Sequence, residues 1–214
     1  MDCNRDIFSG PLVEMTIENL GHRPFVSMEY IENGWFGRND SAVYYSMVKI
    51  RNPRRLIEVG SGYSTRIADQ ACRGTLVCID PSPRADVGEY CDHLLEVPVQ
   101  TLEPETVADC DLLFIDSSHI WGAGDLPFLF NKVFPLLKTG TVVHFHDIFL
   151  PDDYSPAWAP RHYDEQYHLR DFLNEHSEYQ TLWPGYYMAT RRTQEVIDIF
   201  GEATCMGSLW MVKC

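Results

Sequence analysis

The sequence predicts a doubly wound α/β domain built on a mainly parallel sheet, and three observations carry this prediction. Apolar runs of strand length alternate with helix-like segments along the chain. The strand runs are nearly continuous in apolar residues, as parallel strands covered on both faces are. The first run, residues 56–59, leads through a glycine turn at 60–62 straight into a helix start at Ser64 and Thr65. This strand–turn–helix order is the first half of a βαβ nucleotide site.

Each element follows from local signals. Asn39, Asp40 and Ser41 are expected to cap a helix. Pro81 stops a strand that ends in a carboxylate, and Pro98 weakens the strand predicted around it. The predicted strands are 56–59, 75–80, 94–99, 111–116, 141–146 and 208–213, and the predicted helices are 42–50, 65–72, 125–137 and 163–176.

Residues 39–214 form one predicted domain, and residues 1–38 form a short helical or irregular extension. A chain of 214 residues suits a single domain with a full core. Prolines and glycines interrupt short apolar groups throughout the extension, while Trp35 and Phe36 are aromatic enough to pack on the domain. The sequence leaves two roles open for this extension, covering the mouth of a site or forming the contact of a homodimer.

The charge balance limits the partners. A net charge of −14 repels phosphate backbones and anionic lipid, so neither nucleic acid nor a membrane is expected as a partner. Arg51, Arg54 and Arg55 are interpreted as solvated charge beside a strand. No apolar run reaches the roughly 18 residues needed to span a bilayer. The N-terminus lacks the basic flank and apolar core of a secretory signal, so we expect a cytoplasmic protein.

The cysteines bear on the redox compartment. Their number is odd and they form no Cys-x-x-Cys pair, which argues against a disulfide scaffold and against a zinc-thiolate site. We therefore expect reduced, mostly buried thiols. The seven are Cys3, Cys72, Cys78, Cys91, Cys110, Cys205 and Cys214.

Carboxylates follow three of the predicted strands. Asp80, Asp116 and Asp147 each stand where a strand ends. In a doubly wound sheet, ligands bind outside the carboxyl ends of the strands, near the point where strand order reverses. A single aspartate there is usually a turn former or helix cap. Three of them, together with the glycine turn, indicate a binding site.

The spacing around the glycine turn suggests two cofactors. Asp80 comes eighteen residues after Gly62, close to the position of an acid that binds ribose hydroxyls, which would suit NAD. However, Thr65 occupies the third glycine position of the dinucleotide fingerprint. Glu58, just before the glycines, has no role at a pyrophosphate but suits a cationic group such as the α-amino group of S-adenosylmethionine.

At these motifs the sequence resembles the class I S-adenosylmethionine-dependent methyltransferases. Glu58-Val-Gly-Ser-Gly-Tyr-Ser-Thr is similar to their first motif, and Cys78-Ile-Asp-Pro to the second, acidic strand end. More narrowly, Phe114-Ile-Asp-Ser-Ser-His and His144-Phe-His-Asp-Ile-Phe mark a bacterial group of small methyltransferases. In that group Asp164-Glu-Gln-Tyr and Ser208-Leu-Trp recur as well. The resemblance covers residues 56–213 and implies a Rossmann-like sheet of the seven-stranded methyltransferase type.

The resemblance also implies roles for residues. Asp80 would bind the ribose hydroxyls, residues 97–99 would lie by the adenine, and Asp116 would lie beside the transferring methyl group. Glu58 and the backbone of residues 60–62 would bind the methionine part of the cofactor. The full set of implied cofactor-binding residues before Asp80 is Glu58, Gly60, Ser61, Gly62, Ser64 and Thr65.

A histidine cluster adds a second question. Asp116, His119, His146 and Asp147 come from two strand ends that are neighbours in the methyltransferase order, and His144 shares a strand face with His146. Two carboxylates and two imidazoles could bind Fe(II), Mn(II) or Zn(II). Catechol-type O-methyltransferases hold a divalent ion, commonly Mg(II), at this corner with oxygen ligands. The alternatives are a general base, His119 or His146, and a purely structural role.

The functional prediction is S-adenosylmethionine-dependent methyl transfer to an oxygen or nitrogen of a small-molecule acceptor. Asp116, His119 and His146 are the predicted catalytic residues, with metal assistance from the four-residue cluster. The aromatic loop with Tyr154 and Trp158 is a candidate lid. Alternatives are a metal-dependent hydrolase using the His-x-His-Asp run, or Ser117 or Ser118 with His119; a dehydrogenase; and a non-catalytic S-adenosylmethionine-binding protein.

Overall fold

A computed structural model describes residues 6–83 and 86–214 of the chain. Residues 1–5 and 84–85 lie outside the described part. The expectation of a buried, reduced thiol at Cys3 therefore lies outside the described residues, as does the beginning of the predicted extension. Within the described part, no helix has the length and apolar character that crossing a membrane requires.

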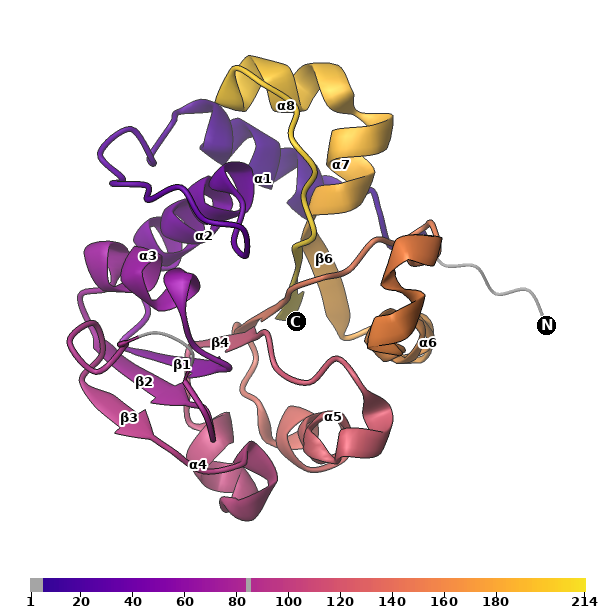
Figure 1. The fold of residues 1–214 in the computed structure, drawn as a ribbon. Coiled ribbons are helices and arrows are strands. Elements are labelled where there is room, and N and C mark those ends of the chain that lie inside the picture. Colours follow the sequence, from indigo (N-terminus) through magenta and orange to yellow (C-terminus); the bar gives the residue numbers. More distant parts are fainter. Residues whose placement is uncertain (1–5, 84–85) are drawn as a thin grey trace.

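Seven strands form one sheet in the order β3-β2-β1-β4-β5-β7-β6 (Figure 1). Strand β7 pairs antiparallel with β5 and β6, and the pairs among β1 to β5 are parallel. This confirms the predicted doubly wound, mostly parallel, Rossmann-like sheet. The strands are β1 Arg55–Val59, β2 Thr75–Ile79, β3 His93–Leu95, β4 Leu112–Ile115, β5 Val142–Phe145, β6 Tyr179–Pro184 and β7 Leu209–Lys213.

Helices cover both faces of the sheet (Figure 1). One apolar core receives side chains from α4, α5 and α6, and the other from α1, α2, α3, α7 and α8. Successive side chains of a strand point to opposite faces of the sheet, so in β1 Ile57 packs in the first core and Leu56 in the second. The helices are α1 Pro11–Gly21, α2 Arg38–Arg51, α3 Tyr63–Ala71, α4 Pro104–Ala108, α5 Asp125–Phe128, α6 Glu165–Glu175, α7 Gly185–Arg191 and α8 Thr193–Phe200.

Several elements differ from the sequence prediction. The expected helix 125–137 is α5 followed by a π-helical turn, Leu129–Val133, and a 3₁₀ turn, Phe134–Leu136. Proline at 135 lacks the N–H that a regular α-helix would need there. The expected strand 94–99 is the three-residue edge strand β3, which ends before Pro98. Strand β6 and helices α4, α7 and α8 had no prediction, and α1 gives the extension a regular helix.

The start of α2 shows a change of role for its polar residues. Asn39, Asp40 and Ser41 were expected to cap a helix, but the helix begins at Arg38, so they lie inside its first turn and are buried. The Asp40 carboxylate accepts hydrogen bonds from Gly207 N at 3.0 Å and from Ser208 Oγ at 2.5 Å. Asp40 thus ties α2 to the segment entering β7.

The order of the strands reverses between β1 and β4. Leu56 in β1 pairs with Leu76 on one side and with Leu112 on the other, so the chain leaves these strands toward opposite edges. The carboxyl ends of β1, β2, β4 and β5 meet at this switch point. A ligand crevice is expected there.

Candidate active site

A cavity of about 750 Å³ lies at this switch point. Its wall includes the glycine turn after β1, Asp80 after β2, Asp116 after β4, and His146 with Asp147 after β5. The cavity also contacts Trp35 and Phe36 of the N-terminal extension. The fold therefore gathers the strand-end carboxylates predicted from sequence around one hollow.

The glycine turn is forced by crowding at Gly60. This residue has a φ of +87°, and a Cβ built on it would lie 1.9 Å from the carbonyl oxygen of Asp116. Only glycine adopts this positive φ readily and also has no Cβ to overlap the Asp116 carbonyl. The turn after β1 is therefore pressed against the end of β4, and the two halves of the cavity touch at this point.

The Asp80 side chain closes the turn from the β2 side. Its Oδ2 accepts from Ser61 N at 2.9 Å and from Ser61 Oγ at 3.0 Å, and its Oδ1 accepts from Ser82 N at 2.8 Å. Ser64, at the start of α3, also lines the cavity. This half is organised largely by backbone groups and one half-buried carboxylate.

Glu58 and Thr65 lie behind the turn instead of on the cavity wall. The Glu58 side chain is fully buried, and it accepts from Tyr44 Oη at 2.8 Å and from Thr65 Oγ1 at 2.6 Å. Thr65 Oγ1 in turn accepts from Gly62 N at 3.0 Å. Burial raises the pKa of Glu58 to about 7, against these hydrogen bonds. The two residues shape the turn, and their direct contact with a cofactor stays a prediction.

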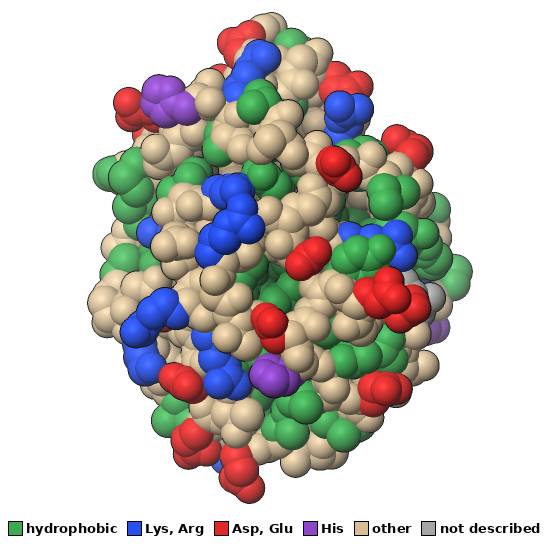
Figure 2. All heavy atoms as spheres, turned by 90° about the vertical axis from the view of Figure 1, so that its left-hand side faces the viewer, with side chains coloured by type: hydrophobic (Ala, Val, Ile, Leu, Met, Phe, Trp, Pro, Cys, Tyr) green, Lys and Arg blue, Asp and Glu red, His purple; other side chains and the backbone are tan. Residues whose placement is uncertain are grey.

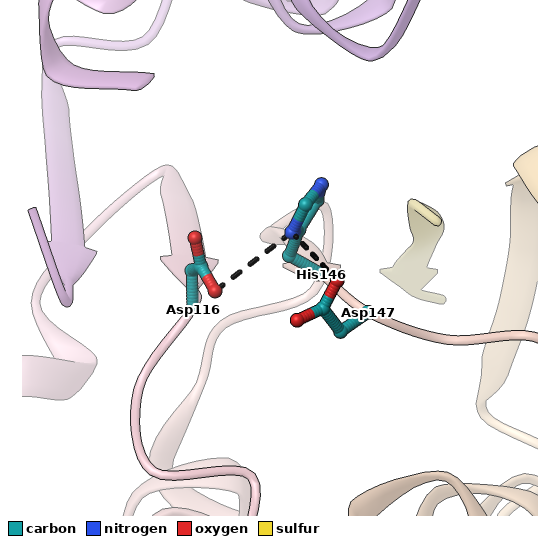
Figure 3. A group of neighbouring side chains, drawn as sticks. All are labelled: Asp116, His146 and Asp147. Atoms are coloured by element: carbon teal, nitrogen blue, oxygen red, sulfur yellow. Dashed lines mark ion pairs between the residues drawn. The ribbon is translucent and has the colours of Figure 1, made fainter. Parts of the chain in front are cut away.

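Asp116, His146 and Asp147 converge on the other side of the cavity (Figure 3). One donor atom from each lies within 4.8 Å of the other two. His146 Nδ1 lies 3.4 Å from Asp147 Oδ1 and 3.8 Å from Asp116 Oδ1. Parallel pairing of Ile115 with Phe145 brings the ends of β4 and β5 together, which explains the convergence.

Carboxylates face both ring nitrogens of His146. On the Nε2 side, Asp40 Oδ2 of α2 lies 3.8 Å away. Burial alone would lower the pKa of His146, but Asp116, Asp40 and Asp147 outweigh it and raise the pKa to about 9. In the absence of another cation, the ring therefore carries a proton at neutral pH.

His119 is held by a residue that the sequence did not assign to it. Its Nδ1 lies 2.8 Å from Glu165 Oε2, and its Nε2 lies 3.2 Å from Asp116 Oδ1 and 3.7 Å from Asp147 Oδ2. Glu165 is fully buried in the first turn of α6. Burial alone would lower the pKa of His119, but Glu165 and Asp116 raise it well above the ordinary value.

The backbone around His119 is also constrained. Its carbonyl oxygen accepts from Asp164 N at 3.0 Å and from Glu165 N at 3.3 Å, which docks the beginning of α6 on this loop. Both His119 and Asp147 have positive φ values, +59° and +57°. Non-glycine residues in this region concentrate at functional sites. His119 faces the cluster but lies outside the three-residue group that Figure 3 draws.

His144 does not join the cluster. It is fully buried, and neither ring nitrogen has a hydrogen-bond partner among the described residues. Its ring stacks on Phe114 at 4.0 Å between centroids, and burial holds its pKa well below the ordinary value. His144 is thus a neutral core ring beneath His146.

The serines next to His119 form no pair with it. Ser118 Oγ donates to Asp125 Oδ1 at 2.7 Å, and Ser117 Oγ has no hydrogen-bond partner among the described residues. A nucleophilic serine needs a base within hydrogen-bond reach. The serine-hydrolase alternative therefore finds no support in the geometry.

The extension contributes directly to the cavity. Phe36 is buried with its ring centroid 5.1 Å from that of His146, while the Trp35 side chain is 63% exposed. Covering the site, the first of the two roles considered for residues 1–38, stays a prediction, and so does the homodimer contact.

Surface charge agrees with the composition. On the face drawn in Figure 2, Lys and Arg side chains are spread out and interspersed with Asp and Glu. No continuous basic patch is visible on that face. The expectation that nucleic acid is not a partner stays a prediction.

Comparisons with known proteins agree with this geometry. Residues 57–148 match the family model described as a methyltransferase domain. No curated protein matches the sequence. The matched segment begins in β1 and ends just after β5, so it spans the glycine turn and every strand end that lines the cavity.

Solved methyltransferase structures share the fold. The SAH-bound methyltransferase PaMTH1 of Podospora anserina superposes with a TM-score of 0.57 at 18% identity, over 99% of this chain and 92% of that one. The SAM-bound O-methyltransferase TomG of Streptomyces achromogenes gives 0.53 at 16% identity, over 97% and 92%. An SAH-bound O-methyltransferase of Bacillus cereus gives 0.51 at 14% identity, over 98% and 93%.

These likenesses establish the fold over nearly the whole chain, and the family model covers the strand ends that line the cavity. Residues 57–148 are thus similar to a methyltransferase domain, and the chain shares its fold with solved methyltransferases.

Proposed function

We propose that this enzyme transfers the methyl group of S-adenosylmethionine to a hydroxyl oxygen of a small-molecule acceptor, with a divalent metal at Asp116, His146 and Asp147. One observation carries the proposal: three potential metal ligands converge in the same cavity as the glycine turn. Several proteins of the same fold are described as O-methyltransferases, which favours oxygen over nitrogen as the accepting atom.

The cofactor fits along the β1–β2 side of the cavity. The backbone of residues 60–62 and the start of α3 offer close approach and free N–H groups to its methionine part. Asp80 stands where it can bind the ribose hydroxyls, and Val99 lines the wall on the β3 side, where the adenine would lie. Gly60 touches Asp116, so the reactive methyl would point toward the carboxylate–histidine cluster.

The cluster has the chemistry of a metal site. Two carboxylates and one imidazole suit Mn(II), Fe(II) or Zn(II) better than Mg(II), which prefers oxygen ligands. Asp40 behind the His146 ring resembles the carboxylate that commonly orients a metal-binding histidine. A metal bound here would act as a Lewis acid and lower the cost of deprotonating the acceptor hydroxyl.

The protein's own groups position the acceptor and control one proton. Glu165 contacts Nδ1 of His119, so Nε2 of the His119 ring faces Asp116 and the cavity. Because carboxylates raise the pKa of His119, the ring keeps its proton at neutral pH and keeps Asp116 ionised. His119 can accept the hydroxyl proton only when another cation shares those carboxylates. The metal and base hypotheses for this corner are therefore linked.

Titration calorimetry with S-adenosylmethionine, on protein whose metal content is measured in the same batch, tests the proposal. We expect Asp80→Ala to weaken cofactor binding by roughly 1.5–3 kcal/mol while the metal is retained. We expect His146→Ala to lose the metal while its cofactor affinity stays within about threefold.

Each half of the proposal can fail separately. Unchanged affinity in Asp80→Ala would remove that residue from the cofactor site. Stoichiometric metal in His146→Ala would remove His146 from the ligand set. Cofactor binding by wild-type protein without metal and without turnover would favour the non-catalytic binding protein.

A further inference from the structure

Charge in the cavity is distributed unevenly. Four aspartates, Asp80, Asp116, Asp125 and Asp147, line it. Arg161 is the only lysine or arginine among the described residues of its wall. The whole chain carries a net charge of −14, and the protonated rings of His119 and His146 face Asp116 and Asp147, so Arg161 is the cation among the described wall residues that is left for an anionic ligand.

Aromatic rings hold Arg161 in place. The residue ends the 3₁₀ segment Pro156–Arg161, and its guanidinium lies 4.2 Å from the ring centroid of Trp158. It also lies 5.6 Å from the ring centroid of Tyr163, and its Nη1 donates to Tyr163 Oη at 3.4 Å. Stacking of this kind fixes the plane of the guanidinium but leaves most of its donors free.

Among the described residues, no carboxylate oxygen lies within 4.0 Å of a guanidinium nitrogen of Arg161, so the side chain forms no ion pair there. Nearby arginines do form ion pairs, since Arg170 pairs with Asp171 at 2.9 Å and Arg191 with Asp152 at 2.6 Å. The Tyr163 ring that Arg161 contacts lies 4.4 Å from the His119 ring between centroids, so the guanidinium is on the side of the cavity formed by the ends of β4 and β5, where the acceptor would enter.

We propose that the acceptor is a hydroxylated aromatic compound bearing an anionic group, a carboxylate or its equivalent, that Arg161 binds. This inference rests on the proposed function. Aromatic side chains of Trp35, Phe36 and Tyr163 line the cavity and suit a flat ring. Arginine forms bidentate hydrogen bonds with carboxylates and phosphates, and this arginine is held ready for them.

The cofactor's own carboxylate is the competing ligand for Arg161. That group belongs to the methionine part, which the proposed function places at the glycine turn after β1. Arg161 instead follows β5 in the chain and contacts Tyr163, whose ring lies against that of His119. Separate measurement of cofactor and acceptor binding distinguishes the two ligands.

Calorimetry on the complex with S-adenosylhomocysteine tests this inference with matched probes, 3,4-dihydroxybenzoate and its neutral analogue 3,4-dihydroxybenzamide. Arg161→Met keeps an apolar stem on Trp158 but removes the charge. The matched control is Arg170→Met, because Arg170 also lies over a tyrosine ring, 5.9 Å from that of Tyr167, but does not line the cavity. Arg161→Lys restores the charge without the bidentate geometry.

We expect wild-type protein to bind the benzoate about tenfold more tightly than the benzamide, a moderate preference because Arg161 is exposed. The preference should vanish in Arg161→Met, return in part in Arg161→Lys and persist in Arg170→Met. Affinity for S-adenosylhomocysteine should be the same in all four proteins.

Other results would overturn the inference. Equal binding of both probes by wild-type protein would remove the anionic subsite, and weaker S-adenosylhomocysteine binding in Arg161→Met would assign the arginine to the cofactor. Failure of both probes on protein that binds S-adenosylhomocysteine would reject the acceptor class and leave the cofactor assignment intact. Failure to bind S-adenosylhomocysteine would reject the proposed function itself.

Discussion

The two halves of the cavity are built in different ways. The β1–β2 half consists of a glycine turn and a helix start, with one carboxylate that accepts from Ser61 and Ser82. The β4–β5 half consists of buried ionisable side chains from strand ends and helices, with two non-glycine residues at positive φ. The first half offers a shape to a ligand, and the second concentrates charge. In the proposed reaction the first half would hold the methyl donor, whose S–CH3 bond breaks, and the second would take part in removing the acceptor's proton.

Each half also has an ionisable residue beneath it, on the side of the sheet that faces α2. Glu58 lies under the glycine turn, and His144 lies under His146. Tyr44 of α2 contacts both, with a hydrogen bond to Glu58 and a ring stacked 6.2 Å from His144. Substitutions at the point where the halves touch, and at these two buried residues, therefore test how each half is built.

The largest effect is expected where the halves touch. In Gly60→Ala, the new Cβ would overlap the carbonyl oxygen of Asp116 at a φ of +87°. Backbone of β1 or β4 must shift, so we expect a loss of about 4 kcal/mol or more in the free energy of unfolding. Urea unfolding followed by circular dichroism measures it.

Gly62→Ala is the matched control in the same turn. A Cβ at Gly62 would meet no atom within 4 Å, so this variant should keep its fold even if its cofactor affinity falls. Equal losses in the two variants would show that the conformation of the turn, and not its contact with β4, determines the loss in the free energy of unfolding.

The contrast between the halves also explains what the sequence could predict. Strand alternation and strand-end position are local, and the glycine turn, Asp80, Asp116 and the His146–Asp147 pair that they indicated all line one cavity, while the roles of these residues stay predictions. The partners of the histidines were not predicted. Asp40 and Glu165 come from helices far away in the chain, and nothing local indicates which ring a buried helical carboxylate will face.

In the fold, too, only the elements with a clear local sequence pattern could be predicted. The parallel strands were predicted because each is an apolar run between turn residues. Strand β6, Tyr179–Pro184, was missed, since it contains glutamine and threonine and ends in a proline. Its ladder with β7 includes an irregularity between Thr181 and Trp183, which a regular pattern does not indicate. Arg161 was missed for another reason, because an arginine in a loop is ordinary until the cavity beside it is known.

A second effect concerns Glu58 and pH. Its pKa is about 7 in the folded protein against an ordinary value of 4.5, because burial disfavours the charged form. Between these values the folded state keeps a proton that the unfolded state has lost, so this group makes stability fall as pH rises from 4.5 to 7. The full difference is about 3 kcal/mol. Glu58→Gln should remove that part of the pH dependence, measured as the free energy of unfolding from pH 4.5 to 8.

An exposed acid provides the control for this measurement. Glu96→Gln, at an exposed position beyond β3, should leave the pH dependence of stability unchanged. If Glu58→Gln and wild-type protein lost stability in parallel as the pH rises, Glu58 would be ionised in the folded state at little cost, and its network with Tyr44 and Thr65 would have to be charged.

The smallest effect is expected at His144. Its ring is neutral and has no hydrogen-bond partner among the described residues, so leucine replaces it without stranding a buried donor or acceptor. Loss of the stacking on Phe114 and of the tilted ring contact with Trp210 opposes the removal of two unsatisfied nitrogens. We therefore expect His144→Leu to change the free energy of unfolding by no more than about 1 kcal/mol. Metal content should be unchanged, whereas His146→Leu, just beyond the end of β5, should lose the metal. Metal loss in His144→Leu would mean that this core ring fixes the position of His146, and the division between core and site along β5 would then be wrong.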